Sequence, residues 1–190
     1  IQSSGDSLAS HTFASAGNYI VNVTVLDKDG ASSSVSRAVS IHSSELQGSV
    51  LAVGGTGLDD QFSISRNTNG TTRIKRGNQL VGDIPMPANG ITLYGGMGSD
   101  RLTVNGTADV DLFEIYSSRV LWDGTAIVGD SIEFRLLNGA GGNDVFTYDS
   151  GNASIDGGGG TDTLLGPNES TVWSITGSNL GSIAGVQFAH

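Results

Sequence analysis

One turn pattern recurs along the chain and constrains its fold more than any other feature. Each of six copies places a large apolar residue seven positions after a glycine, and five copies place an aspartate two positions before that apolar residue. Short strand-like stretches such as ITLYG and RLTVNG precede the turns. Such recurrence predicts a solenoid, in which each circuit of chain buries its apolar residues only against its neighbours. The pairs are Gly55 and Phe62, Gly95 and Leu102, Gly106 and Phe113, Gly139 and Phe146, Gly157 and Leu164, and Gly166 and Trp173; the aspartates are Asp60, Asp100, Asp111, Asp144 and Asp162.

The spacing of the turns indicates the length of one circuit. Gly139 and Gly157 are 18 residues apart, which is enough for two short strands and two turns. Apolar residues do not recur at helical spacing over three turns, and glycine interrupts every window of that length. The sequence therefore predicts an all-β fold whose residues 45–190 form a right-handed parallel β-helix or β-roll-like solenoid. Both ends of the chain fall inside repeating units, so we expect the parent protein to continue in both directions.

Residues 1–44 have a different pattern. In NYIVNVTVLD the apolar residues Tyr19, Val21, Val23 and Val25 alternate, and the following DKDG is typical of a hairpin turn. A second alternating run, SSSVSRAVSI, then returns. This segment predicts an antiparallel β-hairpin.

The same segment resembles the last strands of a PKD domain, an immunoglobulin-like sandwich common in secreted bacterial proteins. The resemblance implies that residues 1–44 are the C-terminal strands of a truncated sandwich, with exposed strand edges unless another chain covers them. It depends on His11, Thr12, Phe13, Gly17, Tyr19, the valine alternation and the turn from Asp27 to Gly30.

Composition narrows the classes of partner. Carboxylates outnumber lysine and arginine by 19 to 9, and the net charge of −10 disfavours binding to nucleic acid or anionic lipid. The chain has no cysteine, which excludes disulfides and thiolate metal sites, and it has no apolar run long enough to cross a membrane. Glycine is abundant, at 29 residues, and fits a turn-rich chain.

Residues 95–103, GGMGSDRLT, fit the nonapeptide GGxGxDxUx, in which U is a large apolar residue. The segment resembles the RTX, or hemolysin-type, repeats, and the resemblance implies a β-roll whose stacked turns share calcium ions. Calcium takes six to eight oxygen ligands, so one turn alone cannot hold it, and Asp144 and Asp162 are the best stacked pair. The candidate calcium residues are Gly96, Gly98, Asp100, Asp144, Asp156 and Asp162.

A second interpretation needs no metal. Each aspartate would accept a hydrogen bond from the backbone N–H two residues further on and so cap its own turn. For Asp60 and Asp111, whose turns lack the second and third glycines, we favour this interpretation. For the glycine-rich turns both interpretations stay open.

Other motifs give little support for catalysis. GDSL at 5–8 matches the nucleophile block of GDSL esterases by its letters, but the late DxxH block of that family is absent. Asp130, Glu133 and Arg135 are a candidate acidic and basic set of a polysaccharide lyase, but strand alternation predicts an exposed salt-bridged pair, Glu133 and Arg135, instead. We therefore expect no enzyme.

Two further groups of residues are candidate binding surfaces. The basic residues of 66–76 predict a solvated hairpin around Asn69 and Gly70, with a contact for acidic polysaccharide as the minor alternative. Trp122 and Trp173 are expected to cap or fill the interior, although an exposed Trp122 beside Tyr116 would stack on a sugar.

The sequence as a whole is similar to large repetitive secreted or surface proteins of Gram-negative bacteria and planctomycetes. That resemblance implies an extracellular, non-enzymatic structural or adhesive segment with calcium-stabilised turns. Its partners would be polysaccharide or other surface proteins, or further copies in filaments or layers. The alternatives are an ancillary polysaccharide-binding domain and a calcium-dependent lyase-type β-helix.

Overall fold

The protein is all-β. The structure, a computed structural model, describes residues 17–177, 179–184 and 186–189, and in these ranges it has 19 strands in three sheets and no helix. The predicted all-β class is therefore confirmed. Within the same ranges no helix is long and apolar enough to cross a membrane. His11, Thr12 and Phe13, which carry part of the resemblance to PKD domains, lie outside the described residues.

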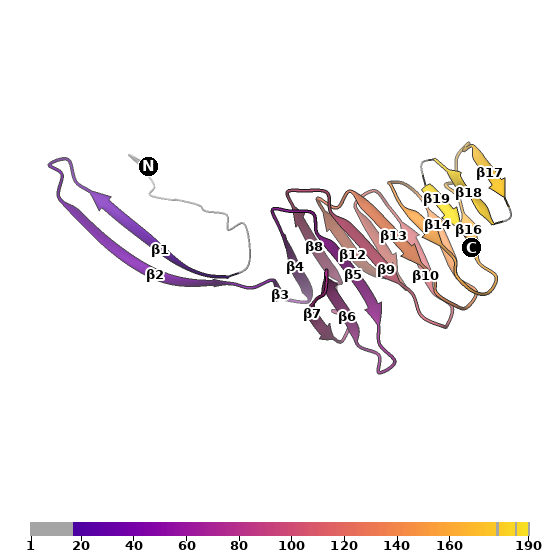
Figure 1. Ribbon diagram of the computed structural model, residues 1–190, viewed down its shortest axis with the longest axis horizontal. Coiled ribbons are helices and arrows are strands. Elements are labelled where there is room, and N and C mark those ends of the chain that lie inside the picture. Colours follow the sequence, from indigo (N-terminus) through magenta and orange to yellow (C-terminus); the bar gives the residue numbers. More distant parts are fainter. Residues whose placement is uncertain (1–16, 178, 185, 190) are drawn as a thin grey trace.

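Strands β1 (Gly17–Leu26) and β2 (Ser32–Ile41) form a hairpin that projects from the rest of the protein (Figure 1). They pair antiparallel from Gly17 opposite Ile41 to Leu26 opposite Ser32. The turn is closed by Asp27, whose Oδ1 accepts hydrogen bonds from the backbone N–H groups of Asp29 and Ala31. The hairpin predicted from the alternating valines is therefore confirmed.

The other two sheets have eight and nine strands. The eight-stranded sheet contains β3 (Ser44–Gln47), β4 (Val50–Thr56), β8 (Ile91–Gly96), β10 (Leu112–Ile115), β11 (Arg119–Trp122), β12 (Thr125–Asp130), β14 (Val145–Tyr148) and β16 (Thr163–Leu165). The nine-stranded sheet contains β5 (Gln61–Arg66), β6 (Thr72–Arg76), β7 (Gln79–Ile84), β9 (Arg101–Asn105), β13 (Phe134–Asn138), β15 (Ser154–Asp156), β17 (Trp173–Gly177), β18 (Leu180–Ile183) and β19 (Val186–Ala189).

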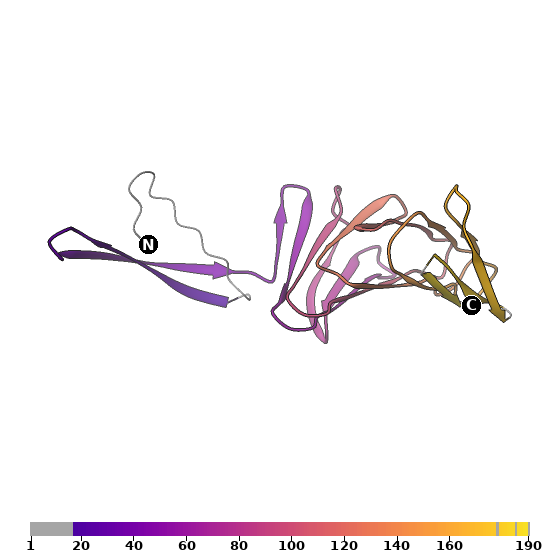
Figure 2. The same ribbon diagram turned by 90° about the horizontal axis from the view of Figure 1, so that it is seen from above.

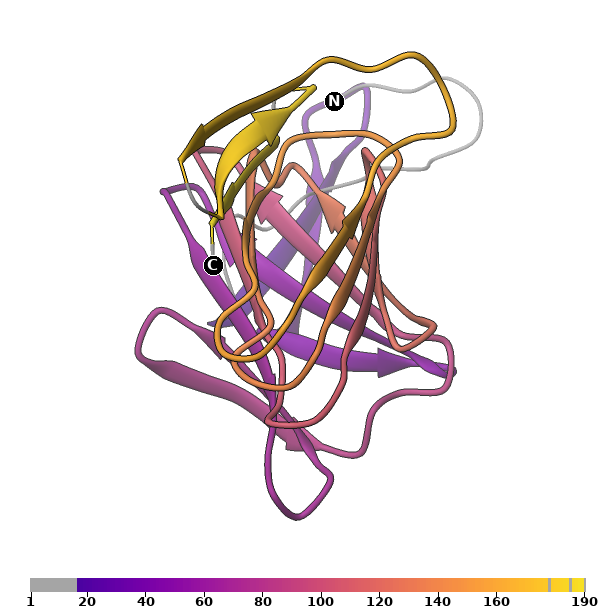
Figure 3. The same cartoon turned by 90° about the vertical axis from the view of Figure 1, so that its right-hand side faces the viewer.

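Strands that follow five of the six repeated turns pair in parallel, whereas β17, after the sixth, pairs antiparallel with β18. In the nine-stranded sheet β5, β9, β13, β15 and β19 form one parallel series, and in the eight-stranded sheet β4, β8 and β12 form another, as do β10, β14 and β16. Antiparallel hairpins interrupt these series at β5–β6–β7, β10–β11–β12 and β17–β18–β19. The two sheets lie on either side of one interior (Figures 2 and 3).

The register places apolar side chains opposite one another along the core. Ile64, Val104, Leu137, Ile155 and Phe188 stand in line across the nine-stranded sheet. The first four are almost completely buried. Burial of each such side chain stabilises the fold by about 1.5–3 kcal/mol. Phe113, Phe146 and Leu164 form the matching line in the eight-stranded sheet.

The expectation for Glu133 and Arg135 was wrong. Arg135 is only 4% exposed and stands opposite Leu102, in a second inward line that begins with Phe62, whereas Phe134 faces outward under the guanidinium of Arg101. Arg135 Nη2 donates to the backbone oxygen of Ser117 at 2.8 Å, and burial lowers the pKa of Arg135. These residues therefore form no exposed ion pair, and an inward Arg135 cannot belong to a catalytic set on the outer face.

Candidate functional site

The repeated turns carry the chain from one large sheet to the other and fall into two rows. The first turn row leads from the eight-stranded to the nine-stranded sheet, and the second turn row leads back. Strand β9 runs from one row to the other, so the rows are one strand length apart. The first turn row contains residues 55–60, 95–100 and 131–133, and the second contains residues 106–111, 139–144 and 157–162.

Acidic side chains connect neighbouring turns within each row. In the second turn row the N–H of Asp111 donates to Asp144 Oδ1 at 2.8 Å, and the N–H of Asp144 donates to Asp162 Oδ1 at 2.9 Å. In the first turn row the N–H of Asp60 donates to Asp100 Oδ1, and the N–H of Asp100 donates to Glu133 Oε2, each at 2.7 Å. We call these two series the carboxylate ladders. Hydrogen bonds to a charged acceptor contribute about 1.5–3 kcal/mol each, so the ladders hold the turns in register.

The turns are of two kinds, which differ in whether the second carboxylate oxygen, Oδ2, of the aspartate accepts a hydrogen bond. Asp60 Oδ2 accepts the backbone N–H of Thr56 at 2.6 Å, and Asp111 Oδ2 accepts that of Thr107 at 2.6 Å. These two aspartates cap their own turns, as favoured from the sequence, although the donor lies four residues before the aspartate and not two after it.

In the glycine-rich turns at 139–144 and 157–162 the equivalent N–H, of Ala140 and of Gly158, donates to another side chain. Ala140 has a φ of 70°, and its N–H donates to Asn138 Oδ1 instead of to Asp144. Asp144 and Asp100 are almost completely buried, and within the described residues the Oδ2 atom of each has no hydrogen-bond partner. An unpaired buried carboxylate oxygen is unfavourable, and a proton, a cation or a bound water molecule would satisfy it.

Burial also changes the acidity of these two groups. The pKa of Asp100 and that of Asp144 are raised, chiefly because burial disfavours the charged form. The hydrogen bonds from the N–H groups of Asp60 and Asp111 oppose this change, and neighbouring carboxylates reinforce it. Those neighbours are Asp60, Glu133 and Asp59 around Asp100, and Asp111, Asp162 and Asp123 around Asp144.

This acidity predicts the pH dependence of stability without metal. A carboxyl whose pKa is raised in the folded state binds protons more tightly there, so its contribution is complete below the ordinary value of 3.8 and is lost as the pH rises through the folded pKa. We expect the melting temperature, measured in chelator, to fall as the pH increases from that value toward neutrality. The pKa of Asp83 is lowered, chiefly by its hydrogen bond with Thr71, so its contribution to stability is complete above 3.8 and is lost only as the pH falls below that value.

The matched variant carries Asp100→Asn and Asp144→Asn together. Both side chains then keep an acceptor oxygen for the ladder but no longer titrate. Its melting temperature should change less with pH over this range than that of the parent chain. Equal slopes for the two proteins would contradict the assignment to these two residues.

The six predicted calcium residues are divided between the two rows. Gly96, Gly98 and Asp100 lie in the first turn row, and Asp144 and Asp162 lie in adjacent turns of the second. Asp156 is exposed at the end of β15, where its Oδ1 accepts the N–H of Gly158.

Gly96 and Gly98 have a steric role. Their φ angles are 100° and 120°, and a Cβ would lie 2.2 Å from the backbone oxygen of Thr56 and 2.7 Å from the backbone carbon of Leu58. The two glycines therefore allow the 95–100 turn to lie directly on the 55–60 turn.

The basic residues of 66–76 are largely paired. The segment forms the predicted hairpin, with β5 and β6 antiparallel. Arg66 pairs with Asp123, Arg73 Nη2 lies 3.0 Å from Asp83 Oδ2, and Arg76 Nε lies 3.7 Å from Asp60 Oδ1. A contact with acidic polysaccharide would have to compete with these carboxylates.

Trp122 fills the interior, as predicted. It is fully buried and stacks on Phe113, and its Nε1–H donates to Asp111 Oδ1 at 2.7 Å. It therefore offers no face to a sugar. Trp173 is 41% exposed and lies edge-on to Phe188.

No known protein family, curated protein or solved structure matches the chain. Within the part of the chain that the structure describes, no three histidine, aspartate or glutamate side chains gather into a metal centre. The carboxylate ladders are therefore the candidate functional site on their geometry alone.

Proposed function

We propose that this chain is a non-enzymatic structural or adhesive segment of an extracellular or cell-surface protein, folded as a right-handed parallel β-helix or β-roll-like solenoid with calcium-stabilised turns. The parallel pairing of strands after successive turns and the single interior between the sheets support a solenoid. The observation that carries the calcium assignment is the pair of buried, unpaired carboxylate oxygens on Asp100 and Asp144.

The residues present fit a hard cation. Calcium binds carboxylate and carbonyl oxygens, and the glycine-rich turns bring both kinds of atom close together. A Cβ on Gly139 would lie 2.2 Å from Asp144 Oδ2 and 2.4 Å from the backbone oxygen of Gly157, so both oxygens lie beside this glycine, as the corresponding oxygens do beside Gly55 and Gly106. Asp144 and Asp162 would hold an ion in the second turn row, and Asp100 with the turn of Gly96 and Gly98 would hold one in the first.

A bound cation would change stability by neutralising the ladders. The carboxylates of each ladder repel one another, and a cation removes that repulsion and the cost of burying charge without a partner. The segment would then be stiff where calcium is abundant, outside the cell, and looser during export. This behaviour suits a part that extends or presents a surface.

The alternatives from the sequence have less support. Polysaccharide binding through residues 66–76 would act on a hairpin whose arginines already have carboxylate partners. Lyase chemistry would lack the basic residue considered for it, because Arg135 is buried.

Calcium should raise the melting temperature, and a chelator should reverse the rise. One site with a dissociation constant on the order of 10⁻³ M, filled at about ten times that concentration, adds about 1.4 kcal/mol. For a chain of this size the rise is about 3–6 °C per site. Differential scanning calorimetry with and without calcium measures it.

Asp144→Asn tests the assignment of the second turn row. The amide oxygen still accepts the N–H of Asp111, so the variant should fold, but it should lose the part of the calcium response that belongs to this row. Asp109→Asn removes the same charge from an exposed position nearby and should respond as the parent does. Absence of any calcium shift in the parent would leave the ladders as turn caps alone.

A further inference from the structure

A polar hollow of about 510 Å³ lies against the outer face of the nine-stranded sheet, next to the first turn row. Strands β5 and β9, which are neighbours in that sheet (Figure 1), supply Gln61, Ser63, Arg101 and Thr103 to its lining. In register, Gln61 stands opposite Arg101 and Ser63 opposite Thr103, at positions that alternate with buried residues of the core. The four side chains therefore face away from the interior and are not used to pack it.

Two turns close the sides of the hollow. The turn between β6 and β7 contributes Gly77 and Asn78, and the N–H of Gly77 donates to the backbone oxygen of Gln61 at 2.7 Å. The first turn row contributes Asp59, whose Oδ1 accepts the N–H of Ser99 at 2.8 Å. Because hydrogen bonds hold both walls, a ligand would bind a hollow that is already formed. The volume falls within the range of about 300–1,000 Å³ that is usual for small-molecule sites.

Arg101 brings to the hollow a charge that the fold does not use. Its guanidinium lies over the ring of Phe134, with Cζ 4.4 Å from the ring centroid, and this contact orients it. Among the described residues the side chain of Arg101 has no ion pair and no hydrogen bond. Arg76 also reaches the hollow, but its Nη1 donates to the backbone oxygen of Gly54 at 2.6 Å. Arg101 is therefore available to an anion, and a guanidinium binds a carboxylate through two parallel hydrogen bonds.

The rest of the lining suits a ligand with many hydroxyl groups. The amides of Gln61 and Asn78 and the hydroxyls of Ser63 and Thr103 can each donate and accept hydrogen bonds. In the part of the chain that the structure describes, none of these four side chains has a hydrogen-bond partner. Asp59 adds an acceptor, and its charge disfavours a densely charged ligand such as nucleic acid. A sugar that carries a single carboxylate matches this combination.

A peptide matches the hollow less well. Strand β5 lies between β9 and β6, and β9 lies between β13 and β5, so neither strand has an open edge to which a peptide could add. Phe62, the apolar residue in the lining, is only 1% exposed and belongs to the core. The hollow therefore offers a peptide neither backbone pairing nor an apolar pocket.

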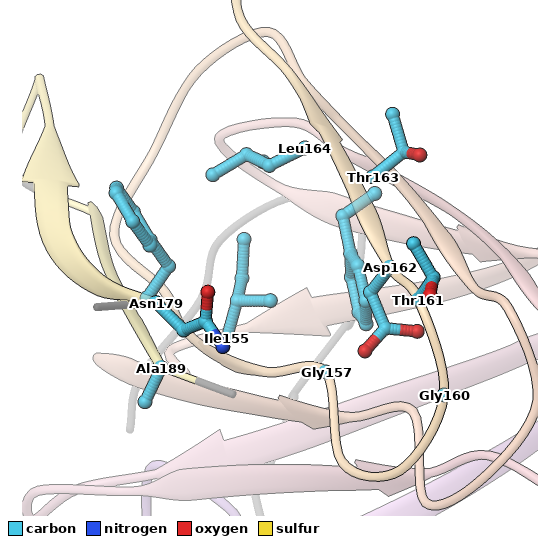
Figure 4. Close-up of a pocket in the computed structure, with 11 residues that line it drawn as sticks. Ile155, Gly157, Gly160, Thr161, Asp162, Thr163, Leu164, Asn179 and Ala189 are labelled. Carbon is cyan, nitrogen blue, oxygen red and sulfur yellow. The ribbon is translucent and has the colours of Figure 1, made fainter.

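Figure 4 shows a different hollow, of about 370 Å³, whose lining includes Phe146, Ile155 and Leu164. These three residues belong to the apolar lines that pack between the two sheets. This apolar hollow is therefore part of the interior and offers a sugar no comparable set of polar groups.

We propose that the polar hollow binds one acidic sugar unit of an extracellular polysaccharide, with Arg101 holding the carboxylate and the amide and hydroxyl side chains binding the hydroxyl groups of the sugar ring. This inference rests on the adhesive role proposed above and gives that role a site and a class of ligand. The site does not use Arg66 and Arg73, whose charges are already paired with carboxylates.

The test measures binding of uronate oligosaccharides to the full chain by isothermal titration calorimetry. Oligomers of galacturonate, glucuronate and mannuronate serve as probes, in chelator, which removes calcium bridges between sugar and protein. At least one should bind, and its analogue with each carboxyl group reduced to an alcohol should bind about tenfold more weakly or worse. Arg101→Gln should cause a similar loss. Arg119→Gln is the matched control, because Arg119 is also exposed and lies over an aromatic ring, that of Tyr116, but on the eight-stranded sheet.

A second measurement needs no variant. On addition of the sugar, the backbone N–H resonances of Gln61, Asn78 and Arg101 should shift, and that of Arg119 should not. Three results would overturn the proposal: no binding of any of the three oligomers, equal losses for Arg101→Gln and Arg119→Gln, or equally strong competition by an oligoglutamate peptide. The calcium response of the melting temperature is measured without sugar, so failure of either proposal leaves the other intact.

Discussion

Gly139→Ala should destabilise the protein by about 3 kcal/mol or more, at the upper end of what an added methyl group does in a packed site. The new Cβ would lie 2.2 Å from Asp144 Oδ2 and 2.4 Å from the backbone oxygen of Gly157. Both atoms belong to the second carboxylate ladder and its backbone, so neither can move without breaking hydrogen bonds between turns. Urea unfolding monitored by circular dichroism would measure the loss as a lower midpoint with an unchanged slope.

Gly54→Ala is the matched control. Gly54 lies in β4, directly before the 55–60 turn, but no atom lies within 4 Å of the position that its Cβ would take. We expect a change within about 0.5 kcal/mol. Equal losses for the two substitutions would show that the cost comes from glycine flexibility and not from the carboxylate.

This contrast gives the turn pattern a physical meaning. In all five aspartate turns the glycine five positions earlier lies against the Oδ2 atom of that aspartate. A side chain at the glycine would displace the carboxylate that the neighbouring turn needs. The spacing of glycine and aspartate is therefore required by the ladder whether or not calcium binds, and the pattern alone does not prove a metal site.

The sequence predicted the class of fold, the N-terminal hairpin and the inward residues of five of the six turns, because these follow from local periodicity. Trp173, the apolar residue of the sixth turn, is 41% exposed. It did not separate the turns into two rows. That division depends on which sheet each strand joins. The antiparallel strands β10, β11 and β12 lie between β14 and β8 in the eight-stranded sheet, and this insertion leaves the turn pattern of the sequence unchanged. Asp123 and Gly124, with φ angles of 48° and 76°, were a hairpin signal for this excursion.

Strand alternation failed at Arg135 for a local reason. Ser131 has a φ of 55°, and the N–H groups of both Glu133 and Phe134 donate to the backbone oxygen of Asp100, at 3.1 and 3.2 Å. Two successive side chains therefore face outward before β13 begins, and the phase of the alternation is reversed. A count of alternating residues through a turn cannot detect such a reversal.

The sequence predicts that the aspartates cap turns, but it does not predict the hydrogen bonds of the carboxylate ladders between neighbouring turns. An aspartate in a glycine-rich turn indicates a cap, but the donor to Asp144 Oδ1 is Asp111, 33 positions away in the chain. Local rules for turns consider only donors within a few residues. The unpaired Oδ2 of Asp144 follows from the positive φ of Ala140, which the sequence does not reveal, because alanine rarely adopts that conformation.

Phe113→Ala should cost about 3–5 kcal/mol, the usual range for removing a buried phenylalanine ring. Phe113 lies between Trp122 and Phe146, with ring centroids 6.0 and 5.0 Å away and interplanar angles of 15° and 8°. Removing the ring leaves a gap between two stacked neighbours that belong to different strands, β11 and β14. The loss would also loosen Trp122, whose Nε1–H holds Asp111 in the second carboxylate ladder. The core and the turn row would therefore weaken together.

Chemical denaturation of three variants separates the effect of lost buried volume from the effect of any substitution in β10. The variants are Phe113→Ala, Phe113→Leu and Leu112→Ala. Leucine restores most of the volume and should recover a large part of the stability. Leu112 is the preceding residue but is 51% exposed, so its removal should cost well under half as much. A loss for Leu112→Ala as large as that for Phe113→Ala would mean that the interior between the sheets does not carry the stability of the stack. We expect Phe113→Ala to be the least stable, Leu112→Ala to be intermediate and the parent to be the most stable. That order would mean that the stability comes mainly from the interior between the sheets, where the Phe113 ring supports the strands on both sides and the turn that precedes it.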